Sequence, residues 1–221
     1  TIAIVAEADI APSDIATFQK LFGLPSNPPK VIVTGADPGT DLLQGYGAEA
    51  TIDTEWALAV APGATVDLVV STPSNTTDGV ALAAMYIVEQ NQAQIVSASY
   101  GECEQNLGTA GNALWNNIWQ QAAAQGMSVF VSSGDSGSVA CDAANVSFLD
   151  SLFGPMAVNG LSSTPFNTAV GGTEFNEPMN GGSIATYWNT TNGSSLASAK
   201  GYIPEMVWND SCDDGHDPNW M

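Results

Sequence analysis

Short apolar runs alternate with longer segments of helical periodicity over roughly the first 140 residues of the chain. The apolar runs, bounded by Gly, Pro or polar residues, predict strands at Thr1–Ala6, Val31–Gly35, Ala64–Ser71, Ile95–Tyr100 and Ser128–Ser133. Between them, helices are predicted from Ser13 or Asp14 to Phe22, over Glu49–Gly63, from Thr77 or Asp78 to Gln90, and over Leu107–Gln125. This alternation predicts an α/β fold with a mostly parallel sheet and right-handed crossovers.

The pattern changes after about residue 140, where Gly, Asn, Ser and Pro dominate and only short strands are expected. Two of these are predicted at Thr168–Gly172 and Ile184–Trp188. No apolar run approaches the roughly 20 residues needed to span a bilayer. The length of 221 residues fits one domain with a substantial core. Because the chain opens directly on a strand-like run, we expect that a preceding segment has been removed.

The predicted helix Glu49–Gly63 is apolar nearly all round and is therefore expected to be buried. It nevertheless carries Glu49 and Asp53, which fall on one face, one turn apart. Like charges at this spacing repel, and burial makes it costly to ionise both, so the pair is a candidate site. The alternative is a structural first turn, with Glu49 near the positive helix end and Asp53 reaching solvent.

A second candidate site is the polar segment Ser132–Ser138, which follows a predicted parallel strand. Its G-D-S-G letters resemble the nucleophile loop of trypsin-like peptidases, but those need an upstream histidine, and the only histidine, His216, lies downstream. Its D-S-G-S letters resemble the active-site loop of pepsin-like aspartic peptidases. That class needs a second such loop, and Asp37-Pro38-Gly39 matches poorly. The pepsin-like interpretation stays as an alternative.

A third interpretation places Asp135 at the carboxyl ends of the strands, beside Glu49 and Asp53. Three carboxyl groups in one cleft cannot all ionise cheaply, so at least one should hold a proton in acid. A protonated carboxylic acid can donate a hydrogen bond to a developing oxyanion. The structural alternative is that Asp135 only forms a turn, as Asp beside Gly commonly does.

Acidic residues far outnumber basic ones, with 23 Asp and Glu against three lysines and a net charge of −20. This balance argues against nucleic acid or an anionic membrane as a partner. With so few cations, few carboxylates can depend on salt bridges, so protonation breaks few pairs and relieves self-repulsion. We therefore expect a protein that works in acid, although halophilic adaptation gives the same balance.

Three cysteines complete the set of chemically notable residues. Cys103 and Cys141 each follow a predicted strand, so a disulfide between them is plausible and fits an exported protein. Cys212 is then left over.

Several segments together resemble the sedolisin (serine-carboxyl) peptidases, which include the kumamolisins, over nearly the whole chain. The specific feature is E-x-x-x-D before A-P-G-A combined with S-G-D. The matching segments are TIAIVAEADI, DIATFQKLFGLP, the Glu49 helix, SASYGECE, SSGDSG, AVGGTEF and YIPEMVWND.

The resemblance implies a subtilisin-like three-layer αβα fold and a secreted endopeptidase that acts in acid on proteins or peptides. It makes Glu49 the general base for a serine, Asp53 the residue that orients Glu49, and Asp135 the oxyanion donor. It also implies an N-terminal pro-segment and a calcium ion whose ligands lie outside this chain, with no metal site within it. The implied substrate-binding residues are Ser97, Ser99, Tyr100, Gly101, Ser133 and Gly134.

The chain departs from the family pattern at the nucleophile. The family serine lies in a G-T-S motif downstream of S-G-D, and here Gly172-Thr173 is followed by Glu174. We therefore expect residues 1–221 to be the N-terminal part of one catalytic domain, incomplete at the C-terminus and inactive alone. A truncated, non-catalytic relative that binds peptides or a partner chain is the remaining alternative.

Overall fold

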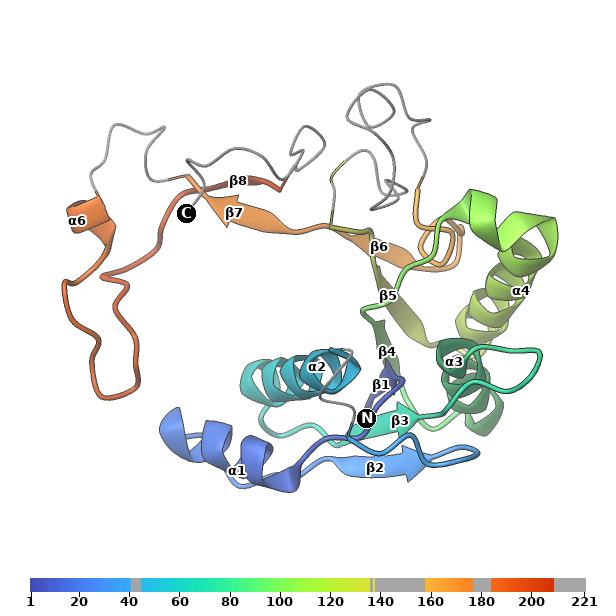
Figure 1. Cartoon of the computed structure of the whole chain (residues 1–221), viewed down its shortest axis with the longest axis horizontal. Helices are drawn as coiled ribbons and strands as arrows, with labels where there is room; N and C mark the ends of the chain where they lie inside the picture. Colours follow the sequence, from blue (N-terminus) through green and yellow to red (C-terminus); the bar gives the residue numbers. More distant parts are fainter. Residues whose placement is uncertain (41–44, 136, 138–157, 177–183, 209–221) are drawn as a thin grey trace. The chain divides into compact units, whose positions relative to one another are not determined.

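A computed structural model describes residues 1–40, 45–135, 137, 158–176 and 184–208 (Figure 1). Their contacts divide the chain into two units. The first unit draws on Thr1–Ser133 and Ala157–Val170, and the second on Gly134–Met156 and Gly171–Met221. The candidate carboxylates Glu49 and Asp53 belong to the first unit.

A parallel sheet forms the centre of the first unit, with strand order β2-β3-β1-β4-β5-β6 among the described residues. All neighbouring strands in it are parallel, as the alternation of strands and helices predicts. The strand bounds are Ile2–Ala6 for β1, Lys30–Val33 for β2, Val66–Val70 for β3, Ile95–Ala98 for β4, Ser128–Ser132 for β5 and Thr168–Val170 for β6.

Helices cover the two faces of this sheet (Figure 1). On one face, α2 packs on β1 and β3, and α1 packs on α2. On the other face, α3 packs on β1 and β3 while α4 packs on β5. The helix bounds are Pro12–Leu21 for α1, Tyr46–Val60 for α2, Gly79–Gln90 for α3 and Glu104–Ala124 for α4, with a break in the helical backbone at Gly108.

Two apolar cores result, because successive side chains of a strand point to opposite faces. Ile4 and Ala6 of β1 belong to the core under α1 and α2, whereas Ala3 and Val5 belong to the core under α3 and α4. Burial of β1 and β3 on both faces explains why their sequences are continuous apolar runs rather than alternating ones. The fold class predicted from the sequence, a subtilisin-like α/β architecture, is confirmed. The pepsin-like alternative, which requires a mostly β fold, is wrong.

One part of the sheet surface is left apolar and exposed. On the face that carries α2, the side chains of Ile95 in β4 and Phe130 in β5 are 38% and 39% exposed. The outer face of α2 continues this surface with Ile52, Trp56 and Val60. The expectation that this helix is buried all round is therefore wrong for its outer face, although Ala50 and Leu58 on its inner face are buried.

The second unit contains a short antiparallel pair, β7 (Thr173–Phe175) with β8 (Glu205–Val207), and the single-turn helix α6 (Ile184–Tyr187). The strand predicted at Ile184–Trp188 is wrong, because the backbone there makes a helical turn closed by a hydrogen bond from the Trp188 N–H to the Ile184 carbonyl. Alternating Ile, Thr and Trp favour a strand, but a run this short does not fix the conformation.

Helix α4 buries Ile118 and Ala122 together with Trp115 and Trp119, whereas Leu114 is exposed. Both tryptophans pack in the core, as expected for aromatic residues at helical spacing.

Leu58 and Val60, two residues apart on α2, provide a matched test of this packing. Leu58 is 1% exposed and Val60 is 80% exposed. We expect Leu58→Ala to lower the free energy of unfolding by about 2–5 kcal/mol, because it leaves a cavity in the core. Val60→Ala should change it by less than about 0.5 kcal/mol. Urea unfolding of both variants checks this, and equal losses would contradict the assigned faces.

Candidate active site

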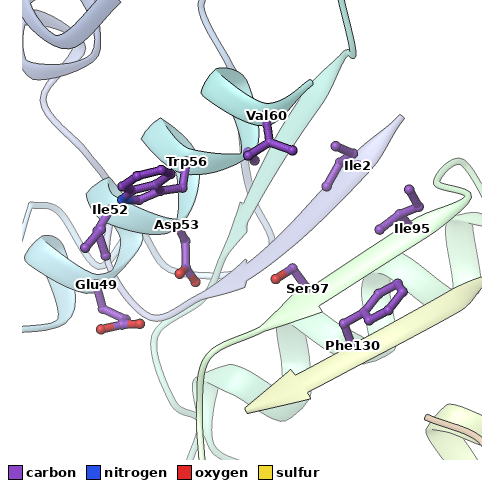
Figure 2. A pocket seen from close by; sticks show the side chains of 10 residues that line it. Ile2, Glu49, Ile52, Asp53, Trp56, Val60, Ile95, Ser97 and Phe130 are labelled. Atoms are coloured by element: carbon purple, nitrogen blue, oxygen red, sulfur yellow. The ribbon is translucent and has the colours of Figure 1, made fainter. Parts of the chain in front are cut away.

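Helix α2 presents Glu49 and Asp53 to an open pocket of about 520 Å³ (Figure 2). Gly45, with a left-handed φ of 88°, is the N-cap residue that turns the chain into the helix, and as a glycine it provides no side-chain cap. Both carboxylates project from the first half of the helix toward Ser97 on β4 (Figure 2). The pair predicted from the sequence therefore shares one pocket.

The rest of the pocket wall is apolar. It combines the exposed side chains of α2 with residues of three neighbouring strands (Figure 2). The apolar lining residues are Ile2, Ile52, Trp56, Ala57, Val60, Ile95 and Phe130. Asp53 loses water beside such a wall, which favours its protonated form.

Asp53 is held by β4 and is largely removed from water. Its Oδ1 accepts a hydrogen bond of 2.9 Å from the Ser99 hydroxyl, and its Oδ2 is buried without a hydrogen-bond partner among the described residues. Burial raises the pKa of Asp53 to about 6, the Ser99 hydrogen bond opposes this, and the Glu49 charge adds to it. This geometry differs from the alternative in which Asp53 simply reaches solvent.

The strand segment implied to bind substrate lies beside this pair. Ser97 lines the pocket, and Ser99 directs its hydroxyl at Asp53. The Tyr100 hydroxyl accepts a hydrogen bond of 3.1 Å from the Glu7 N–H, and burial is the main reason that the pKa of Tyr100 is raised. Tyr100 and Gly101 line a second cavity of about 490 Å³.

Glu7 is a further acidic residue at this end of the sheet, and sequence reasoning did not single it out. It follows β1 directly and lines the second cavity with Asp78. Burial raises the pKa of Glu7, as does the charge of Asp78, while the backbone N–H groups of Gly79 and Val80 oppose the rise. A polar residue directly after a buried parallel strand was the available signal.

Ser133, Gly134 and Asp135 follow β5. The Ser133 N–H donates to the Val170 carbonyl at 2.9 Å, and Gly134 adopts a φ of 116° that favours glycine. Asp135 belongs to the second unit, where its backbone carbonyl accepts a hydrogen bond from the Trp208 indole N–H. The convergence of Asp135 with Glu49 and Asp53 stays a prediction.

Cys103 forms a disulfide. Cys141, its predicted partner, and Cys212 both lie outside the described residues.

Within the described ranges, no three His, Cys, Asp or Glu side chains group in a way that would hold a metal ion. The calcium ion that the family resemblance implies, with its ligands outside this chain, stays a prediction. No helix in the described part of the chain is long and apolar enough to cross a membrane.

Comparison with known proteins identifies relatives of this fold. The model of the subtilase family matches residues 34–208. Sedolisin from Pseudomonas sp. (strain 101) is 32% identical over 201 residues, which are 86% of this chain and 33% of sedolisin. A solved Pseudomonas sedolisin, described as a serine-carboxyl proteinase complexed with two molecules of pseudo-iodotyrostatin, has a TM-score of 0.65 at 24% identity. That match covers 90% of this chain and 55% of the other.

The chain belongs to the subtilase family, whose fold the parallel sheet displays. Within it the chain is related to the sedolisins, which are serine-type peptidases. The family resemblance seen in the sequence is thereby confirmed. The chain spans about a third of the length of the curated relative that it matches.

The raised pKa of Asp53 makes stability depend on pH. The folded chain keeps this proton up to a pH of about 6, whereas the ordinary value is 3.8. The stabilisation that this proton gives the folded chain is therefore fully present below pH 3.8 and is lost as the pH rises through 6. Between pH 4 and 7 we expect the wild-type free energy of unfolding to fall by about 2 kcal/mol more than that of Asp53→Asn.

Urea unfolding across this pH range measures the difference. Asp37→Asn, which alters an exposed carboxylate, is the control and should retain the wild-type slope. Parallel wild-type and Asp53→Asn curves would show that Asp53 ionises in the folded chain as it does in water.

Proposed function

We propose that this chain carries the general base, its orienting partner and the oxyanion donor of a serine-carboxyl endopeptidase that acts in acid. The main support is the Glu49–Asp53 pair in one partly apolar pocket, with Asp53 anchored by Ser99 and its pKa raised to about 6. The relationship to sedolisin gives these residue types a peptidase context. The proposed substrates are proteins or peptides.

In the proposed reaction, a serine hydroxyl attacks the scissile carbonyl carbon while Glu49 accepts the hydroxyl proton. Asp53 holds Glu49 in position through a shared proton, and Asp135, as a carboxylic acid, donates a hydrogen bond to the oxyanion that forms. Glu49 then returns the proton to the leaving amine, and an acyl-enzyme remains. Water hydrolyses this ester with the same base, which restores the serine.

Both carboxyl roles require acid. A glutamate with an ordinary pKa of about 4.3 accepts protons effectively only near that pH. Asp135 must keep its own proton in order to donate. The charge of −20 at neutral pH is consistent with this proposal, since self-repulsion decreases as the carboxylates are protonated.

We place the nucleophilic serine on polypeptide outside residues 1–221, because this chain has no G-T-S motif. The exposed apolar surface over β4 and β5 supports this assignment, since parallel sheets are normally covered on both faces. That surface adjoins Glu49 and Asp53, so polypeptide packed there would reach both carboxylates. An N-terminal pro-segment, secretion and calcium bound outside this chain complete the proposal.

The first experiment is to determine the intact masses of the native material and its activity on casein at pH 4 and pH 7. A second polypeptide containing G-T-S, or a longer chain that includes it, together with greater activity at pH 4, is expected. Pure residues 1–221 that bind peptides without cleaving them would instead favour a non-catalytic relative.

Glu49→Gln tests the general base in the assembled peptidase. The amide cannot accept the serine proton, so we expect kcat to fall by at least about 10²-fold while the unfolding midpoint is retained. Glu55→Gln on the same helix is the matched control, because Glu55 does not line the pocket, and it should keep wild-type kcat. Near-normal turnover by Glu49→Gln would exclude the proposed role.

Asp135→Asn tests the oxyanion donor. Loss of one such donor typically lowers kcat by about 10² to 10³-fold, because the hydrogen bond strengthens only in the transition state. Steady-state kinetics at pH 4 measure this effect. A change confined to KM would show that Asp135 acts in ground-state binding instead.

A further inference from the structure

Asn159 is a buried side chain that uses all of its hydrogen-bonding groups at the carboxyl ends of β4 and β5. It is 3% exposed. Its Nδ2 donates to the Tyr100 carbonyl at 3.1 Å and to the Ser132 carbonyl at 2.8 Å. Its Oδ1 accepts from the backbone N–H groups of Glu102 at 3.2 Å and Leu161 at 3.0 Å.

These hydrogen bonds lie just beyond the last paired residues of β4 and β5. The parallel pairing of β4 with β5 ends at Ala98 and Val131. Beyond that point the backbone groups of the two strands need other partners, since unpaired buried carbonyl and N–H groups are destabilising. Asn159 takes the place of the missing ladder by bonding the Tyr100 carbonyl on one side and the Ser132 carbonyl on the other.

The segment that carries Asn159 is itself fixed to the end of β4. The Gly160 N–H donates to the Glu102 carbonyl at 2.9 Å, and the Glu104 N–H donates to the Val158 carbonyl at 3.1 Å. The side chain is therefore held from its own backbone as well as through its amide. Because its own backbone is fixed in this way, Asn159 can set the distance between the ends of β4 and β5.

Gly101 shows how closely Asn159 approaches. A Cβ added at Gly101 would lie 2.9 Å from Asn159 Nδ2, which is shorter than real Cβ contacts. A side chain at position 101 would therefore displace the amide from its carbonyl partners. Space for Asn159 explains why glycine fits here, since the Gly101 backbone does not have a positive φ.

We propose that Asn159 is a positioning residue that fixes the peptide-binding edge, Tyr100–Gly101–Glu102, relative to the Ser132–Ser133 end of β5. The inference rests on the proposed function together with the substrate-binding residues that the family resemblance implies at these strand ends, Tyr100 and Gly101 on one and Ser133 on the other. It adds a residue that neither touches the peptide nor takes part in proton transfer. Its effect should appear in peptide affinity, because misplaced strand ends lose hydrogen bonds to an extended ligand.

Asn159→Asp is the sharpest variant, because it keeps the shape but replaces the Nδ2 donor with an oxygen that faces two carbonyls. Asn27→Asp is the matched control. Asn27 Nδ2 also donates to two backbone carbonyls, of Pro62 at 3.2 Å and Ala64 at 2.8 Å, but these precede β3 at the amino end of the sheet. Both variants lose the same kind of bond, and only one of them lies at the proposed site.

The measurements use the assembled peptidase at pH 7, where the proposed acid mechanism is slow, and a random library of blocked octapeptides. We expect Asn159→Asp to weaken peptide binding at least tenfold and to speed hydrogen exchange of the Glu102 and Leu161 amides. Asn27→Asp should bind within twofold of wild type. If Asn159→Asp does not fold, Gly101→Ala displaces the same amide with a single methyl group and should weaken binding at least threefold.

The outcomes separate the two levels of the proposal. If wild type binds peptides and folded Asn159→Asp or Gly101→Ala binds equally well, the positioning role is wrong and the proposed function stands. Equal losses in Asn159→Asp and Asn27→Asp would also overturn it, because they would reflect general destabilisation. If wild type binds no octapeptide, the proposed function fails, and the positioning role fails with it.

Discussion

Partial burial of Asp53 beside Glu49 is the constraint on which the candidate site depends. An isolated carboxylate removed from water is destabilising, and a neighbouring negative charge increases the cost. The hydrogen bond from the Ser99 hydroxyl offsets part of this cost. The part that it does not offset raises the pKa of Asp53. A structural carboxylate would normally gain further donors, yet among the described residues Asp53 Oδ2 is buried without a hydrogen-bond partner. The arrangement therefore favours the protonated form of Asp53 over its charged form.

The same helix shows why this arrangement needs a partner surface. Helix α2 buries its inner face against β1 and β3, while its outer face continues across Ile95 and Phe130 on the sheet. Exposed apolar side chains that adjoin one another over two elements are typical of an interaction surface. Under the proposed function, polypeptide that covers this surface would also remove water from Glu49 and Asp53. Covering the surface and completing the site would then be one event.

The sequence predicts which segments form helices and strands better than it predicts which of their faces are covered. The alternation of apolar runs and helical segments places β1, α2, β3 and α3 within a few residues, because each run is fixed by local periodicity. It does not show which face of α2 is covered, since Ile52 and Leu58 are equally apolar and differ only in what lies opposite. The strand wrongly predicted at Ile184–Trp188 has the same cause, because a short apolar run is resolved only by its neighbours.

The candidate site likewise combines residues that the sequence predicts from local spacing with residues that it does not predict. The spacing of Glu49 and Asp53 is a local property of a helix, so the sequence alone brings them together. Ser99 and Asn159 act through contacts with residues 27 to 59 positions away, and no periodicity records such contacts. The side-chain amide of Asn159 bonds to backbone atoms of the described residues, so no pairing of residue types in the sequence points to it.

Both of these side chains act at the carboxyl ends of parallel strands, where the ladder stops and backbone groups need new partners. At β4, one strand end supplies Ser99 to a carboxylate, and the next residues supply carbonyl and N–H groups to Asn159. A change in the position of β4 would therefore reach the Asp53 carboxyl group and the proposed peptide-binding edge together. Ser99 and Tyr100 are adjacent in the sequence, so the hydrogen bond to Asp53 and the hydrogen bonds to Asn159 are made by one backbone segment that follows β4.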